Sequence, residues 1–364
     1  MLKLPNKQYA VRYFFLVPAL VILTSLPVLS KTAVPVFLLA GQSNMSGYAS
    51  ANDLTADQKT SVENVKIYVD MTWENNGKLK EWMTLGPGFG SFSNNIGPEL
   101  SLGRTLSEKL PDTKIAIVKV CCGSTYLGNY ASKPDDCWIP PSSNNGNAGP
   151  HYKRMLSAVD DAFKAFNSAY DTSEYVPMWA GFVWHQGEFD GQEKNLADAY
   201  ETNLTCLIND IRKDLNVTDL PAIIPMIDVQ GSWQFNSIIR AAEVAVTKKL
   251  NNVDTLDTKG FPTDGVHYKA QGQVKMGTIA AERWLDMEFV YDPTVKICQF
   301  NNMTSKHPRI TIQSGWSNLI DLSGRKFAPS QGKALQSILS SSNIYIATKN
   351  GHGTGGLKMI KLYK

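Results

Sequence analysis

The sequence predicts an α/β protein in which helices cover both faces of a parallel β-sheet. Short, largely apolar segments alternate along the chain with longer segments of helical periodicity. Strands that are apolar throughout are buried on both faces, which is typical of parallel sheets covered by helices. Ligands bind such sheets outside the carboxyl ends of the strands. We therefore expect reactive side chains directly after the predicted strands.

Five segments are predicted as strands of this sheet. The first, residues 34–40, reads VPVFLLA and ends at Gly41. The other four are residues 65–69, 114–121, 178–184 and 222–229. Five helices are expected where apolar residues recur at helical spacing, at residues 98–110, 151–170, 196–215, 235–250 and 273–285.

Two long segments, residues 72–96 and 129–149, are rich in Gly, Asn, Pro, Ser and Trp and interrupt this alternation. Loops of this length in a compact domain are usually functional or disordered. They carry the aromatic residues Trp73, Trp82, Phe89, Phe92 and Trp138. These side chains either offer apolar faces to sugars or anchor the loops.

Residues 1–30 have the features of a secretory signal peptide. Three basic residues come first, namely Lys3, Lys7 and Arg12. The uncharged residues 13–29 follow, and Val28 and Ser30 provide small side chains before a cleavage site at Lys31. A membrane anchor is disfavoured, because this segment has only 17 residues and two prolines. We expect a secreted or cell-surface protein without a stable membrane anchor after cleavage.

The charge distribution divides the rest of the chain. The first 30 residues carry three basic and no acidic side chains, so removing them takes the net charge from +3 to 0. No basic patch then argues for a nucleic-acid partner. From Lys296 onward there are ten Lys or Arg and one acid, a net charge of +9, which leaves −9 for residues 31–295. We therefore expect a main domain at residues 31–292 and a basic β-rich module at 297–364.

The five cysteines leave two states open. Cys121, Cys122, Cys137, Cys206 and Cys298 form no CxxC pair and no Cys/His cluster with metal-ligand spacing. Cys121 and Cys122 are adjacent and poor partners for each other. A disulfide from one of them to Cys137 is one alternative, and buried free thiols are the other.

Candidate catalytic residues follow the first and third predicted strands. Ser43 lies in GQSNMSG, where a turn between glycines can expose its hydroxyl at the edge of the sheet. The segment is not a GxSxG elbow, and a serine here also suits a helix N-cap. Gly123 lies in a GST turn, and its N–H could donate to an oxyanion. An ordinary turn is the alternative for that segment.

Polar residues also follow the fourth strand, and others lie near the end of the main domain. The segment WHQGEFD contains Gln186, whose amide suits an oxyanion donor, and Glu188, which could instead form a structural pair with His185. The segment DGVH places Asp264 three residues before His267. An acid at this spacing can fix the imidazole tautomer while the histidine accepts a serine proton.

Together, GQSNMSG, GST, WHQGEFD and DGVH resemble the four blocks of the SGNH hydrolases. Within that group they look like carbohydrate esterase family 6, which also groups with sialate O-acetylesterases. The resemblance covers about residues 34–290. It implies a flavodoxin-like three-layer α/β/α sandwich with a central parallel sheet. Two positions depart from the family pattern, because Ser124 replaces the second glycine of GGT and Phe189 replaces a smaller residue.

The resemblance also implies roles for the residues. Ser43 matches the nucleophile and His267 the general base, while Asp264 matches the triad acid. Glu188 is the alternative acid, since some relatives use the glutamate of QGE. By the motif alone, Asp264→Asn is expected to cost more activity than Glu188→Gln. The matching oxyanion donors are the Ser43 N–H, Gly123 and Gln186.

The function implied is an O-acetylesterase acting on polysaccharide, above all acetylated xylan, without a metal or organic cofactor. One alternative is a sialate O-acetylesterase, whose anionic substrate predicts a cationic pocket. Another is a non-catalytic carbohydrate-binding protein, which intact Ser43, Asp264 and His267 disfavour. The tail segments LIDLSGR, NIYIA and KMIKL resemble the C-terminal sorting domains of type IX secretion cargo and basic modules of bacterial cell-wall-degrading enzymes. An accessory β domain that packs on the esterase or binds glycan is the alternative for the tail.

Overall fold

The computed structural model describes residues 28–71, 80–228, 233–287 and 294–298, together with four short strands between residues 318 and 361. The predicted signal peptide lies outside the described residues except for 28–30, and so does Trp73. None of the described helices is long and apolar enough to cross a membrane.

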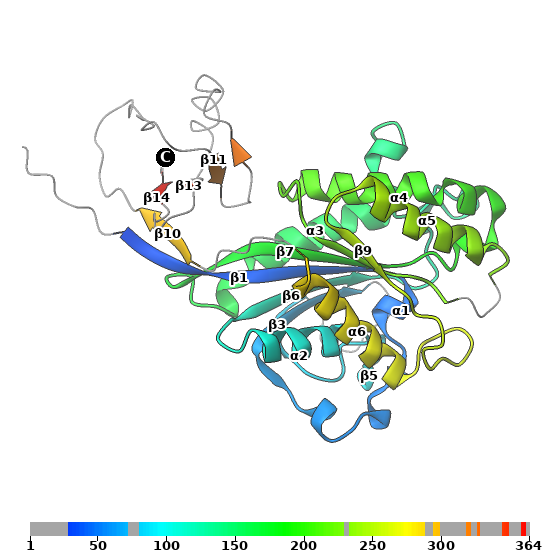
Figure 1. The fold of residues 1–364 in the computed structure, drawn as a ribbon, viewed down its shortest axis with the longest axis horizontal. Helices are drawn as coiled ribbons and strands as arrows, with labels where there is room; N and C mark the ends of the chain where they lie inside the picture. Colours follow the sequence, from blue (N-terminus) through cyan, green and yellow to red (C-terminus); the bar gives the residue numbers. More distant parts are fainter. Residues whose placement is uncertain are drawn as a thin grey trace, which may run out of the picture.

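A mostly parallel sheet forms the centre of the protein (Figure 1). Its strand order is β4-β3-β6-β1-β7-β8-β9, and β10 pairs with one end of β1. The strands are β1 Val28–Gly41, β3 Val62–Met71, β4 Trp82–Leu85, β6 Ile115–Cys121, β7 Tyr175–His185, β8 Ala222–Pro225, β9 Val253–Leu256 and β10 Thr294–Cys298. Only β4 and β10 run antiparallel to their neighbours.

Helices cover both faces of the sheet (Figure 1). One face carries α2 (Glu99–Lys109) and α6 (Ala270–Leu285), and the other carries α3 (Pro150–Lys164), α4 (Lys194–Asp214) and α5 (Asn236–Lys249). Successive β1 side chains alternate between the two layers. Leu38 packs in the α3–α5 layer and Leu39 in the α2–α6 layer, and both are fully buried. This burial on both faces explains why the strand reads as a continuous apolar segment.

The predicted α/β fold class is confirmed, and each of the ten predicted elements corresponds to a helix or strand of the structure. The strand expected at residues 222–229 is shorter and ends at Pro225. The helix expected at 151–170 ends at Lys164 and is followed by a short 3-10 helix, Phe166–Ser168. Strands β4 and β9 were not predicted, and neither was the small antiparallel pair of β2 (Ala49–Ser50) with β5 (Asn95–Ile96).

The tail contains short strands. β11 (Asn318–Asp321), β12 (Lys326–Phe327), β13 (Ile344–Thr348) and β14 (Lys358–Lys361) form an antiparallel sheet in the order β12-β11-β13-β14. Residues 294–298 instead join the central sheet as β10, where Cys298 is paired with Val28. Independence of the tail therefore stays a prediction, because its first strand belongs to the main sheet.

The cysteine alternatives are resolved for four residues. No disulfide joins Cys121, Cys122, Cys137 and Cys206 to one another, and the first three are buried. The Cys137 sulfur accepts a hydrogen bond from the Tyr130 N–H and donates to the Lys133 carbonyl. It therefore packs within its own loop and does not bridge to the adjacent strand.

Candidate active site

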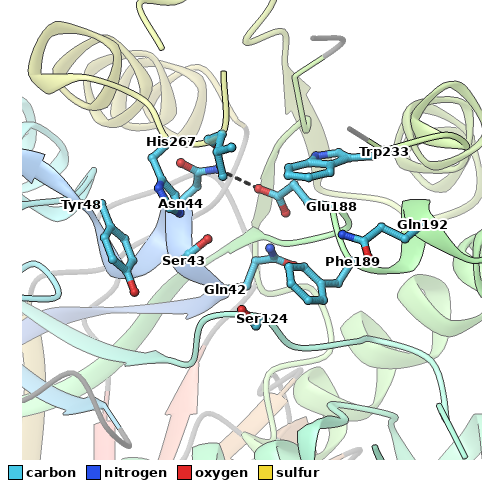
Figure 2. Close-up of a pocket in the computed structure, with 11 residues that line it drawn as sticks. Gln42, Ser43, Asn44, Tyr48, Ser124, Glu188, Phe189, Gln192, Trp233 and His267 are labelled. Atoms are coloured by element: carbon cyan, nitrogen blue, oxygen red, sulfur yellow. Dashed lines mark hydrogen bonds between the residues drawn. The ribbon is translucent and has the colours of Figure 1, made fainter. Parts of the chain in front are cut away.

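The four motif segments meet at the carboxyl ends of β1, β6 and β7. A pocket of about 300 Å³ lies there, at the lower end of the range for small-molecule sites. Figure 2 shows side chains from all four segments around it. The lining residues are Gln42, Ser43, Asn44, Tyr48, Ser124, Glu188, Phe189, Gln192, Trp233, Val266 and His267.

The turn that carries Ser43 depends on glycine. Gly41 has φ 147°, and a Cβ there would lie 2.0 Å from the carbonyl oxygen of His185. The Gln42 N–H donates to that carbonyl, and the Cys122 N–H donates to the Gly41 carbonyl. The turn is thus fixed to both neighbouring strands. Ser43 begins the one-turn helix α1 (Ser43–Ser46) and is partly exposed in the pocket.

A buried ion pair stabilises the turn that carries Ser43. Lys119 on β6 and Glu99 on α2 are both fully buried, with 2.7 Å between Nζ and Oε2. The Lys119 ammonium also donates to the carbonyls of Ser46 and Phe89, each at 2.8 Å. All three ammonium hydrogens therefore have acceptors, which a buried charge requires. The end of α1 is held in place by this one side chain.

Asn44 connects the serine turn to the other two segments. Its side-chain nitrogen donates to Glu188 Oε1 at 2.8 Å, the bond drawn in Figure 2, and to the Val266 carbonyl at 3.1 Å. Its side-chain oxygen accepts from the Tyr268 N–H at 3.1 Å. Asn44 was not predicted as a site residue, although its place beside Ser43 in GQSNM was a signal. Asn44 sets the position of the histidine loop relative to the nucleophile.

Asp264 shapes the loop that carries His267. Its Oδ1 accepts hydrogen bonds from the N–H groups of Val266, at 2.9 Å, and His267, at 2.7 Å. The His267 amide bond is the main reason why the pKa of Asp264 lies below its usual range. The Asp264 side chain is exposed and does not line the pocket. Its carboxylate thus faces the backbone of its own turn.

The imidazole of His267 is oriented by an aromatic contact. It stacks on the Tyr48 ring with 4.3 Å between centroids and 8° between planes. Within the described ranges, the only close approach of a histidine nitrogen to a carboxylate oxygen is the one of 3.8 Å between His185 and Glu188, so neither candidate acid contacts the His267 ring here. Catalytic hydrogen bonds are often long before substrate binds, so this geometry does not remove either acid as a candidate.

Glu188 is a buried carboxylate in the pocket wall. Its side chain is 2% exposed, and Oε2 has no hydrogen-bond partner among the described residues. Nδ1 of His185 is 2.7 Å from the Pro225 carbonyl, and Nε2 lies 3.8 Å from Glu188 Oε1. A buried oxygen that accepts no hydrogen bond costs folding free energy, so Oε2 can accept a hydrogen bond from another group at the site. Among the described residues, Glu188 therefore has a carboxylate oxygen in the pocket wall that accepts no hydrogen bond, whereas Asp264 does not line the pocket.

Gln186 occupies a different position from the one its proposed role requires. It is fully buried, does not line the pocket, and its amide nitrogen lies within 3.1 Å of three acceptors: Gln42 Oε1, the Thr125 carbonyl and Asp190 Oδ2. An amide nitrogen has two hydrogens, so neither is left for an oxyanion. This geometry gives no support to Gln186 as an oxyanion donor. Its contacts instead hold the three strand ends together.

Asp190 completes this internal network. Its carboxylate accepts from the N–H groups of Leu127 and Gly128 as well as from Gln186. Burial raises the pKa of Asp190 to about 6, against the effect of these hydrogen bonds. The residue ties the loop after β6 to the end of β7.

The oxyanion turn keeps a glycine-like shape. Ser124, which stands where the family has its second glycine, has φ 59° and lines the pocket. This left-handed conformation costs a non-glycine residue about 1–2 kcal/mol. In the described part of the chain, the N–H groups of Gly123 and Ser43 donate to no protein acceptor. Both remain available to a ligand oxygen. The described residues of the chain contain no cluster of His, Cys, Asp and Glu that could hold a metal ion.

Comparisons with known proteins identify the family of this chain. A family model described as a carbohydrate esterase, sialic acid-specific acetylesterase, matches residues 33–286. A probable carbohydrate esterase of Arabidopsis thaliana is 25% identical over 265 residues, covering 69% of this chain and 90% of the relative. The crystal structure of that Arabidopsis protein superposes with a TM-score of 0.53 at 20% identity, over 70% of this chain and 98% of its own. A carbohydrate acetylesterase of Xanthomonas citri gives a TM-score of 0.49 at 15% identity, over 81% and 69%.

Proposed function

Because the chain belongs to the carbohydrate esterase family of sialic acid-specific acetylesterases, we propose that it removes acetyl groups from a neutral polysaccharide such as acetylated xylan. The observation that carries this proposal is the composition of the pocket. Among the residues that the structure describes, no Lys or Arg lines it, and Glu188 is the only acid that does. Three aromatic side chains, those of Tyr48, Phe189 and Trp233, do line it. Aromatic faces suit the apolar C–H faces of an uncharged sugar.

A sialate O-acetylesterase is the second candidate, because the family model carries that description. Sialic acid has a carboxylate, and proteins usually bind carboxylates with Arg or Lys. The pocket offers neither, and the buried Glu188 would repel an anion. A neutral substrate therefore fits the pocket better than an anionic one.

The proposed mechanism is acyl transfer through Ser43. His267 takes the hydroxyl proton as Ser43 Oγ attacks the acetyl carbonyl, and a tetrahedral oxyanion forms. The N–H groups of Ser43 and Gly123 stabilise that oxyanion, and each such donor typically contributes about 10²–10³ in rate. The bond to the sugar oxygen then breaks as His267 returns the proton to it. Water, activated by His267, hydrolyses the acetyl-serine to acetate.

We also propose that Glu188 stabilises the imidazolium formed in each step. Its Oε2 is buried and without a donor, whereas the Asp264 oxygen Oδ1 already accepts two backbone amides. Asp264 acts in this proposal on the shape of the loop. It presents His267 at the pocket edge but does not contact the reacting atoms.

Acetate release from a matched panel tests the substrate proposal. The panel contains acetylated xylan, acetylated xylo-oligosaccharides, an acetylated neutral monosaccharide and O-acetylated sialic acid. We expect the highest kcat/KM on the neutral substrates. A preference for O-acetylated sialic acid would support the second candidate and contradict the first.

Secretion and the role of the tail are part of the same proposal. The N-terminus supports export, because three basic residues precede the uncharged segment 13–29. The net charge of +9 from Lys296 onward supports a separate function for the tail. We propose that residues 297–364 act in sorting or attachment and not in chemistry.

A protein ending near Asp292 tests this assignment. It loses β10, which pairs only with residues 28–32 of β1, about 30 Å along the strand from Gly41. We expect it to keep its turnover of 4-nitrophenyl acetate and to lose surface display or binding to insoluble substrate. A cooperative loss of melting temperature and turnover would show instead that the tail belongs to the catalytic fold.

A further inference from the structure

Phe92 stands out among the apolar side chains of the described surface. It is 56% exposed, and the other exposed large hydrophobic residues there are the aliphatic Val244 and Val266. The other aromatic residues of the two long segments, 72–96 and 129–149, are anchored where the structure describes them. Phe89 and Trp138 are buried, the Trp82 indole donates to the Ala162 carbonyl, and the half-buried Tyr130 donates its hydroxyl to Glu193. Among these described aromatic residues, Phe92 is the one that faces solvent.

The turn that displays Phe92 is firmly built. The Asn95 N–H donates to the Phe92 carbonyl at 2.8 Å, and the Ser91 N–H donates to the Gly47 carbonyl at 2.8 Å. The Asn95 side chain donates to the carbonyls of Tyr48 and Ala49. The turn is therefore attached to the segment that directly follows the nucleophile. The exposed ring is held at a defined place beside the site.

A continuous row of rings leads from Phe92 to the catalytic base. The Phe92 ring meets the Tyr48 ring edge to face, with 6.0 Å between centroids, and Tyr48 stacks on His267. Tyr48 lines the pocket (Figure 2). Phe92 thus extends the aromatic wall of the pocket outwards on the side of His267.

The direction of proton transfer determines which part of the substrate lies beside Tyr48 and Phe92. His267 must give its proton to the sugar oxygen that leaves, so the acetylated sugar lies on the His267 side of the pocket. A polymer that extends from that sugar along the aromatic wall would pass Tyr48 and reach Phe92. From this arrangement we infer that Phe92 forms a second subsite, which stacks on the neutral sugar residue adjacent to the acetylated one. The inference rests on the proposed function and names its substrate as a chain, not a single sugar.

The expected effect follows from apolar burial. Covering one face of a phenyl ring removes about 50 Å² from water, which corresponds to roughly five- to tenfold in affinity. The measurement is kcat/KM for acetylated xylose, acetylated xylotriose and 4-nitrophenyl acetate. We expect the trisaccharide to exceed the monosaccharide in wild type. Phe92→Ala should lower the ratio of trisaccharide to 4-nitrophenyl acetate activity about five- to tenfold.

Three further variants make the test specific. Phe92→Trp should keep the preference for the trisaccharide, whereas Phe92→Leu, which is apolar but not flat, should lose it. Val244→Ala removes an exposed apolar side chain on α5, outside the pocket lining, and should change neither ratio nor melting temperature. A wild-type enzyme without preference for the trisaccharide would overturn the subsite, and so would an unchanged ratio in Phe92→Ala. A wild type that cleaves 4-nitrophenyl acetate but no acetylated sugar would overturn the proposed function, and the subsite with it.

Discussion

The acid partner of His267 can be identified by comparing Glu188→Gln with Asp264→Asn. In Glu188→Gln the amide oxygen can still accept from Asn44, but an NH₂ group replaces the free acceptor Oε2. An amide cannot stabilise the imidazolium as a carboxylate does. Loss of the triad acid in a serine hydrolase costs up to about 10⁴ in kcat, so we expect a fall of about 10²–10⁴-fold.

Asp264→Asn should behave differently, because asparagine keeps an oxygen that accepts the same two amides. The two hydrogen bonds lose their charge, which roughly halves their strength, so we expect about 1 kcal/mol of lost stability. The activity should fall less than about tenfold, on the scale of a small loop displacement costing up to about 1.4 kcal/mol. This ranking reverses the one that the sequence motif alone suggests.

The assay is kcat for 4-nitrophenyl acetate together with the melting temperature of each variant. The two quantities separate a chemical role from a structural one. If Asp264→Asn loses more than a hundredfold at an unchanged melting temperature while Glu188→Gln stays active, the assignment of Glu188 is refuted and Asp264 is the acid.

Three other variants test the site. Ser43→Ala should lower the rate of acetate release more than about 10⁴-fold with the melting temperature unchanged. A rate near that of the wild type would exclude Ser43 as the nucleophile. Tyr48→Leu should lower kcat about three- to tenfold, since an aromatic pair contributes about 0.5–1.5 kcal/mol, whereas Tyr48→Phe should keep kcat. Equal kcat values in the two variants would contradict the proposal that the Tyr48 ring orients His267. Lys119→Met should cost about 3–5 kcal/mol in urea unfolding because it leaves Glu99 buried and unpaired, and adding Glu99→Met should recover part of it; a cost below about 1 kcal/mol would show that the pair is not needed.

Much of the fold could be predicted because its strands are buried on both faces. Such strands leave a continuous apolar signal, as in VPVFLLA of β1. The elements missed are those without this signal. β4 (WMTL) and β9 (VDTL) are short and only partly buried, and β2 and β5 have two residues each. Their pairing depends on the strands beside them and not on their own composition.

Some residues that line the pocket could be predicted from the sequence, but their contacts could not. Ser43, Glu188 and His267, which the motifs contain, all line one pocket. They could not show that Gln186 turns inward, because a polar side chain at a strand end serves a ligand or the protein interior equally well. The direction of the Asp264 carboxylate was likewise hidden, since the spacing D-x-x-H suits both a turn that caps its own amides and a catalytic pair.

The sheet order explains how much of the site the fold itself assembles. β1 lies between β6 and β7, so the residues after these three strands meet without further help. The histidine loop follows β9, which lies at the edge of the sheet and is separated from β1 by β7 and β8, and it leads into α6. Its position depends on Asn44, which holds both the Val266 carbonyl and the Tyr268 N–H. The nucleophile turn therefore positions its own base.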